Sequence, residues 1–326
     1  MKKWSFNLVK NSLWMLSSAI IIISIIGWVN FTKTSIPGPS HIKVGIGETI
    51  ITPPGPVGFP MAGYDRGNHS STGIHDELHA RSIVVEGANG NTVVLMTVSV
   101  VNIIEPIMDM IRKGVEKQTG ISYKNVAISS THTHSGPVIG LAESNYGQFF
   151  IGRCVQSAVN AWKSRVPGKI GFGSTEIFGL SMNDRSMNYG GLPADPEAGV
   201  IKVEDAQGKL MGVFFNFGCH PSTLDLHNLL FTEDWPYYSI KAIKDQVGPN
   251  VIVGFYQSAQ GDAKIGYQAE LSAVGANMNG IRTFEFAARK AQIMTDAVLK
   301  LLPSIKTSGD QEVLCSYDHF NFPRRT

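Results

Sequence analysis

The sequence predicts an α/β fold, with mixed β-sheets packed against flanking helices and an active site at the C-terminal ends of strands. Short apolar segments typical of strands alternate with segments of helical period, and turn residues separate them. Its 34 glycines and 43% hydrophobic residues suit a loop-rich α/β enzyme rather than a helical bundle. Three of the apolar segments end in polar side chains, and in open α/β sheets ligands bind at such strand ends.

The expected elements begin near residue 41. Residues 41–46 alternate as a strand does, and the apolar runs at 80–86 and 92–98 form a hairpin around Asn89-Gly90-Asn91. Next come a helix over 104–118 and a strand over 125–128.

The second half of the chain continues this pattern. Four apolar residues between 151 and 162 recur at the spacing of one helix face. Asp234 is a good N-cap, with Pro236 in the first turn of a helix that reaches about residue 246. The remaining expected elements are strands over 169–173, 199–203, 210–217 and 250–256, and a helix over 281–302. The strands over 199–203 and 210–217 are expected to pair as a second hairpin around residues 205–208.

Residues 1–38 differ from the rest and are expected to be a membrane anchor and linker. Three lysines precede an uncharged apolar run at 13–29, whose 17 residues would span roughly 25 Å as a helix. No A-x-A cleavage site follows, so we predict an uncleaved signal anchor, with secretion after signal cleavage as the alternative. The lysines keep the N-terminus in the cytoplasm, which would place residues 39–326 on the extracytoplasmic face.

The charge and the cysteine count argue against a nucleic-acid partner and a disulfide framework. The formal net charge is only +2 and no basic block stands out, so we expect no nucleic-acid partner. The three cysteines are an odd number, and no disulfide framework can be read from them.

The most distinctive stretch is Ser129-Ser130-Thr131-His132-Thr133-His134-Ser135-Gly136-Pro137, which follows the strand at 125–128. In an extended segment residues i and i+2 point the same way, so His132 and His134 are expected to face one site. The alternative is a polar turn whose imidazoles bond to backbone. His220 follows the strand at 210–217 and Asp262 follows the strand at 250–256. Convergence of three strand ends favours a functional site over a turn.

Histidines at these positions fit a zinc site, because neutral imidazoles are frequent zinc ligands and catalytic zinc sites commonly have three protein ligands. His132 and His220 are the metal candidates, with His134 either a third ligand or a hydrogen-bond donor beside the metal. Zinc would polarise a carbonyl and generate hydroxide near neutral pH, as amide hydrolysis requires. Arg185 lies in a loop of small residues and is a candidate to hold a substrate oxygen, although a surface arginine is the alternative.

The motif at 131–137 resembles the zinc-ligand loop of the neutral (non-lysosomal) ceramidase family. Asn216-Phe217-Gly218-Cys219-His220-Pro221 resembles the family's second zinc-histidine loop, and residues 183–186 resemble its substrate-arginine loop. Gln260-Gly261-Asp262 resembles the approach to the family's nucleophile. The resemblance covers about residues 42–303, in the family's order.

This resemblance implies that residues 39–326 are a ceramidase-like catalytic domain that hydrolyses the amide of ceramide to a fatty acid and a sphingoid base. It makes His132 and His220 zinc ligands, His134 a donor near the scissile carbonyl, and Arg185 a substrate contact. A lipid amide substrate would suit a membrane-anchored enzyme. The family's remaining zinc ligands, a glutamate and a tyrosine, are expected beyond Thr326, so the domain is predicted to be incomplete at its C-terminus.

One departure from the family concerns the nucleophile. Family members have Gly-Asp-Val-Ser-Pro, whereas this chain has Gly261-Asp262-Ala263-Lys264-Ile265, with Lys264 at the serine position. Asp262 and Lys264 therefore remain catalytic candidates, with water on the zinc as the expected attacking group. The alternatives are a non-catalytic relative that binds metal or lipid at the cell surface, and a zinc hydrolase of another amide or ester.

Overall fold

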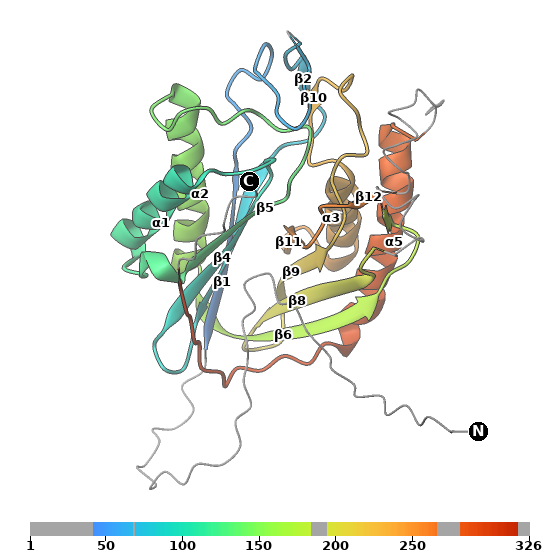
Figure 1. Ribbon diagram of the computed structural model, residues 1–326. Coiled ribbons are helices and arrows are strands. Elements are labelled where there is room, and N and C mark those ends of the chain that lie inside the picture. The colour runs from blue at the N-terminus through green and yellow to red at the C-terminus, as the bar shows by residue number, and fades with distance from the viewer. Residues whose placement is uncertain (1–41, 68, 184–193, 266–280, 319–326) are drawn as a thin grey trace, which may run out of the picture. The chain divides into compact units, whose positions relative to one another are not determined.

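The computed structural model describes residues 42–67, 69–183, 194–265 and 281–318 (Figure 1). Within these ranges, no helix is long and apolar enough to cross a membrane. The predicted signal anchor at 1–38 and the candidate Arg185 both lie outside the described residues.

The central element is one eight-stranded sheet with the order β11-β9-β8-β6-β1-β3-β4-β5. The strand pairs are antiparallel except at the two ends of this order, where β4–β5 and β9–β11 are parallel. The mixed sheet confirms the predicted α/β class. The strands are β1 (Lys43–Ile50), β3 (His79–Glu86), β4 (Thr92–Val98), β5 (Val126–Ser130), β6 (Val166–Glu176), β8 (Glu197–Asp205), β9 (Leu210–Phe217) and β11 (Ile252–Gln257).

Two pairs of helices flank the sheet (Figure 1). Helices α1 (Glu105–Thr119) and α2 (Asn145–Lys163) pack on the β1-β3-β4-β5 half, and their buried faces form one hydrophobic core with it. Helices α3 (Trp235–Val247) and α5 (Phe284–Leu301) pack on the other half and form a second core with β8, β9 and β11. Each helix buries the apolar stripe that its periodicity predicts.

A third core cluster lies between the two halves of the sheet, with Ile46 of β1, Ile83 of β3 and Phe214 of β9 among its members. The sheet bends around this cluster, so its two edges approach one another. Thr97 of β4 donates a hydrogen bond to the carbonyl oxygen of Phe255 in β11, 2.5 Å away. The C-terminal ends of β5, β9 and β11 therefore meet, as expected from the sequence.

The predicted hairpins at 80–98 and 199–217 are confirmed by the β3–β4 and β8–β9 pairings. Helix α2 begins six residues before its predicted start at 151, because Ser144 caps it by accepting a hydrogen bond from the Gly147 amide and because Tyr146 is also buried. The short elements were not predicted, because their pairing partners are distant in sequence. These are β2 (Gly73–Ile74) with β10 (Leu230–Phe231), and β7 (Ser181–Asn183) with β12 (Ala263–Ile265). The 3₁₀ turns η1 (Tyr123–Asn125) and η2 (Leu302–Ser304) were also not predicted, because three residues are too few to show a period.

Candidate metal centre

Three histidines from two distant loops come together at the strand ends. One ring nitrogen from each of His132, His134 and His220 lies within 4.8 Å of the other two. The ring centroids are 5.0 Å apart for His132 and His134, 4.9 Å for His132 and His220, and 5.4 Å for His134 and His220. Imidazoles at this mutual spacing form a cluster able to hold a metal ion.

The local geometry of the double-histidine motif differs from the expected extended segment. Strand β5 ends at Ser130, and His132 adopts a left-handed backbone conformation with φ of 68°. Non-glycine residues rarely take this conformation, and those that do cluster at functional sites. The His132 amide donates a hydrogen bond to the carbonyl oxygen of Val100 at 3.0 Å, and this bond stabilises the turn. A turn, rather than strand alternation, therefore brings the two rings together.

Backbone carbonyls orient two of the rings. Nδ1 of His132 lies 2.7 Å from the Val101 carbonyl oxygen, and Nδ1 of His220 lies 2.8 Å from the Gln260 carbonyl oxygen. A carbonyl only accepts, so each Nδ1 carries the hydrogen and each Nε2 keeps its lone pair. This is the arrangement in which ring nitrogens of metal-binding histidines are fixed by a second hydrogen bond. The hydrogen bonds of His132 and His220 to backbone carbonyls are therefore compatible with metal binding by the same two rings.

His134 has no such partner. Both of its ring nitrogens are buried and neither makes a hydrogen bond within the described residues. An unsatisfied buried polar group costs about 1–3 kcal/mol, which coordination of a metal would offset. Burial, with the nearby His132 and His220, lowers the pKa of His134 to about 3, so this ring is neutral at pH 7, as a ligand must be. The donor set therefore fits a metal, with His134 placed close enough to be a third ligand.

Gln257, at the end of β11, joins the two histidine loops. Its Nε2 donates to the carbonyl oxygens of Thr131 at 2.9 Å and Cys219 at 3.1 Å, each of which directly precedes a histidine of the cluster. Asp262 was the residue predicted at this strand end, and Gln257 was not predicted. Its position as the last residue of an apolar strand was the available signal.

Lys264 lies beside the cluster, whereas Asp262 does not belong to it. Strand β12 contains Lys264 and forms a bridge with His220, whose amide donates to the Ala263 carbonyl at 2.9 Å. After burial and the neighbouring His132, the charge of Lys264 also contributes to lowering the pKa of His220. Asp262 is exposed, and the described cluster of possible metal ligands does not include it.

A buried charge network lies behind the double-histidine loop. Glu233 accepts hydrogen bonds from Arg81 at 2.7 Å and from Ser99 at 2.6 Å, and all three residues are buried. The preceding residue, Thr232, accepts at its carbonyl a hydrogen bond from the hydroxyl of Thr133, which lies between the two histidines. The network thus supports the loop from its buried side.

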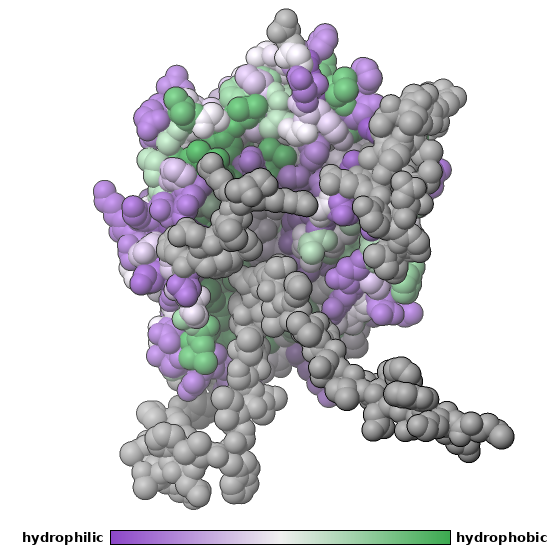
Figure 2. Space-filling view, in the orientation of Figure 1, coloured by the Kyte–Doolittle hydropathy of each residue, from purple (hydrophilic) through white to green (hydrophobic). Residues whose placement is uncertain are grey.

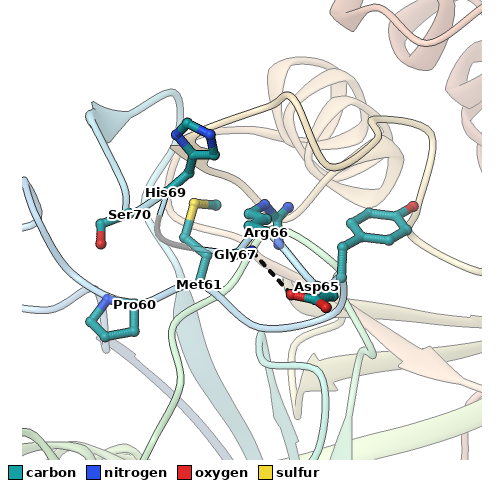
Figure 3. Close-up of a pocket in the computed structure, with 8 residues that line it drawn as sticks. Pro60, Met61, Asp65, Arg66, Gly67, His69 and Ser70 are labelled. Carbon is teal, nitrogen blue, oxygen red and sulfur yellow. Dashed lines mark hydrogen bonds between the residues drawn. The ribbon is translucent and has the colours of Figure 1, made fainter.

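An open pocket of about 300 Å³ is formed by residues between Pro60 and Ser70 (Figure 3). Tyr64 and Arg66 form part of its wall, and both also contact His134. The pocket is lined by Pro60, Met61, Tyr64, Asp65, Arg66, Gly67, His69 and Ser70.

The loop after the histidine motif exposes apolar side chains. Val138 is 43% exposed and Leu141 is 73% exposed, both between His134 and helix α2. Figure 2 shows that hydrophobic residues gather in the upper left of the molecular face, at the level of the upper end of α2 in Figure 1. Large contiguous apolar patches, rather than single exposed residues, mark surfaces that bind partners or lipids.

Comparisons with known proteins agree with the resemblance seen in the motifs. A family model described as neutral/alkaline non-lysosomal ceramidase, N-terminal, matches residues 42–267. The neutral ceramidase of Drosophila melanogaster is 26% identical over 238 residues, which are 65% of this chain and 33% of the relative. That of Pseudomonas aeruginosa is 27% identical over 216 residues, which are 59% of this chain and 32% of the relative.

The fold matches as well. The crystal structure of the neutral ceramidase from Pseudomonas aeruginosa superposes with a TM-score of 0.71 at 22% identity, covering 83% of this chain and 45% of the other. This chain therefore spans about a third of the length of the curated relatives it matches.

Proposed function

The chain belongs to the neutral/alkaline non-lysosomal ceramidase family, and from this premise we propose that it is a zinc-dependent amidohydrolase acting on ceramide-like lipids. The proposed reaction adds water across the N-acyl amide and yields a fatty acid and a sphingoid base. The observation that carries the proposal is the three-histidine cluster, in which two rings are oriented by carbonyls and the third has buried, unpartnered nitrogens.

We assign His132 and His220 to the metal, because the hydrogen bond of each Nδ1 to a backbone carbonyl leaves the Nε2 lone pair for coordination. Zinc supplies Lewis acidity for polarising an amide carbonyl and activating water near neutral pH. In this proposal His134 donates a hydrogen bond to the substrate or completes the ligand set, and Arg185 contacts the substrate. Asp262 and Lys264 are the candidates for positioning the reacting groups on the side of β12.

A lipid substrate is supported by the exposed apolar side chains of Val138 and Leu141, which follow the histidine loop directly. Removing such side chains from water stabilises a complex with an acyl chain by about 25 cal/mol per Å² of apolar surface. We also propose that residues 1–38 anchor the protein in a membrane with residues 39–326 on the extracytoplasmic face.

The second candidate function is a non-catalytic relative that binds metal or lipid. Lys264 favours it, because the residue at the position of the family's nucleophile lies beside His220 and carries no hydroxyl group. A lysine ammonium has no lone pair for attack, and a deprotonated lysine would form an amide rather than the acyl ester that a serine forms.

The deciding experiment measures the zinc content of the purified protein and the release of fatty acid from a fluorescent ceramide in detergent micelles. We expect about one zinc per chain and turnover that His132→Ala abolishes. Zinc-free protein, or turnover that His132→Ala leaves unchanged, would refute the hydrolase proposal.

The variant Lys264→Ser separates the two candidates. If the wild type binds zinc but is inactive and Lys264→Ser gains activity, the site is that of a non-catalytic relative. If the wild type is active and Lys264→Ser is no faster, Lys264 is compatible with hydrolysis.

A further inference from the structure

A short segment at residues 61–66, here called the strap, lies between the loops that carry His134 and His220. Its Ala62 amide donates to the Gly136 carbonyl at 2.8 Å, and Met61 forms a bridge with Pro137. These contacts tie the strap to the chain immediately after His134.

Tyr64 contacts both loops at once. Its hydroxyl donates to the carbonyl oxygen of Leu224 at 3.0 Å and lies 3.3 Å from that of Ser222, and both residues follow His220 closely. Its ring packs edge-on against the imidazole of His134, with centroids 4.7 Å apart. The Tyr64 ring therefore restricts the orientations available to the His134 ring.

Arg66 makes a second connection of the same kind. The side chain is buried, and its guanidinium donates to the carbonyl oxygens of Ala62 at 2.9 Å, His134 at 2.8 Å and Asn228 at 3.3 Å. Its central carbon lies 5.2 Å from the centroid of the Tyr64 ring, within the range of a cation–π contact. A planar guanidinium can serve three acceptors in fixed directions, which a lysine ammonium on a flexible stem cannot reproduce.

The backbone of the strap also lies unusually close to His134. Gly63 has φ of 99°, and a Cβ at this position would lie 2.4 Å from the Cα of His134. Only glycine allows this approach, so the strap and the histidine loop are in direct backbone contact.

We propose that Tyr64 and Arg66 are positioning residues that hold His134 against His132 and His220 and thereby set the metal affinity of the cluster. His134 needs such support, because neither of its ring nitrogens is held by a hydrogen bond in the described structure. Groups that orient metal ligands in this way typically change affinity by about 10–100-fold when removed. The inference rests on the proposed metal-binding function, with His134 completing the ligand set.

The test compares Arg66→Lys with Arg112→Lys in the full chain. Arg112 is a matched control, since its Nε donates to a carbonyl oxygen, that of Val126, at 3.1 Å and its guanidinium carbon lies 5.6 Å from the ring of Tyr317. Titration with Co²⁺, followed by its visible absorption, reports both affinity and coordination geometry. We expect Arg66→Lys to weaken binding by at least about tenfold and to alter the spectrum, whereas Arg112→Lys changes neither.

Amide hydrogen exchange of the metal-free protein gives a readout that does not depend on metal. Peptides covering residues 131–137 are expected to exchange faster in Arg66→Lys than in wild type, and to be unchanged in Arg112→Lys. Tyr64→Phe, which keeps the ring and loses the hydroxyl, serves as the second variant if Arg66→Lys does not fold.

Failure of the proposed metal-binding function and failure of the positioning role give different results. If wild type binds no Co²⁺, the proposed function fails, and exchange at 131–137 still decides whether the strap holds His134. If exchange at 131–137 is unchanged in the folded strap variants, or changes equally in Arg112→Lys, the positioning role is overturned whatever the metal result. Unchanged Co²⁺ affinity in folded strap variants of a metal-binding wild type overturns it equally.

Discussion

The rings of His132 and His220 lie 4.9 Å apart, although one follows β5 and the other follows β9, and these strands are far apart in the order of the sheet. Bending of the sheet brings their ends together. Gln257 of β11 then donates hydrogen bonds to the carbonyl oxygens of Thr131 and Cys219, which directly precede the two histidines. The candidate metal centre therefore depends on how the sheet closes as well as on the histidine motifs.

Removing a cluster histidine should abolish stabilisation by metal. At a free Zn²⁺ concentration 100 times its dissociation constant, binding to the native state adds about 2.7 kcal/mol to the free energy of unfolding. We expect Zn²⁺ to raise the Tm of wild type and a chelator to reverse this, whereas His220→Ala shows no such shift. His227→Ala is the control, because the His227 side chain is 82% exposed and outside the cluster. Equal Tm shifts in wild type and His220→Ala would contradict the assignment.

Gln257→Met should destabilise the protein without changing the side-chain volume much. The substitution leaves the buried carbonyls of Thr131 and Cys219 without the donor they share, and losing a buried partner costs about 1–3 kcal/mol. Urea unfolding measures this free energy. Gln292→Met is the matched control, since Gln292 makes only an exposed contact with Asp296 and should change stability by less than about 0.5 kcal/mol. Similar losses in both variants would argue against the bridging role.

Glu233 should make stability depend on pH in the acid range. Burial by itself raises the pKa of this carboxyl, but the charge of Arg81 and the hydrogen bonds from His79 and Arg81 outweigh it and lower the pKa to about 2 from 4.5. Because the folded-state pKa is the lower one, the stabilisation is fully present above about pH 4.5 and is lost as the pH falls through about 2.

The size of this contribution is on the order of 3 kcal/mol. Urea unfolding from pH 7 to pH 2 should show a smaller acid-induced loss for Glu233→Gln than for wild type. Glu312→Gln, at an exposed carboxylate, controls for the removal of a charge. Parallel stability curves for wild type and Glu233→Gln would show that this network does not carry the acid sensitivity.

Gly63→Ala and Gly67→Ala should differ strongly, although both glycines have positive φ. A Cβ at Gly63 would lie 2.4 Å from His134 Cα, whereas a Cβ at Gly67, with φ of 56°, meets nothing within 4 Å. Gly67→Ala therefore measures backbone strain alone, about 1 kcal/mol. We expect Gly63→Ala to lose more stability by urea unfolding and to weaken Co²⁺ binding. Equal losses in the free energy of unfolding would mean that the histidine loop moves to accommodate the added methyl group without destabilising the protein.

Local patterns in the sequence were enough to predict the α/β class, both hairpins, the four long helices and the histidines that form the cluster. These features depend on neighbours in the chain: periodicity selects helix or strand, and turn residues separate them. The cap at Asp234 belongs here too, although its side chain accepts hydrogen bonds from the amides of Thr223 and Leu224 as well as from Trp235.

Only the tertiary structure decided which polar residues surround those histidines. The contributions of Gln257, Tyr64 and Arg66 depend on contacts between residues distant in sequence, and no local period signals such contacts. The left-handed turn at His132 was likewise not predicted, because the carbonyl that accepts its amide hydrogen bond belongs to Val100, which follows β4 and is distant in sequence. The sequence determined which residue types were available for the site, and the bending of the sheet decided which of them meet.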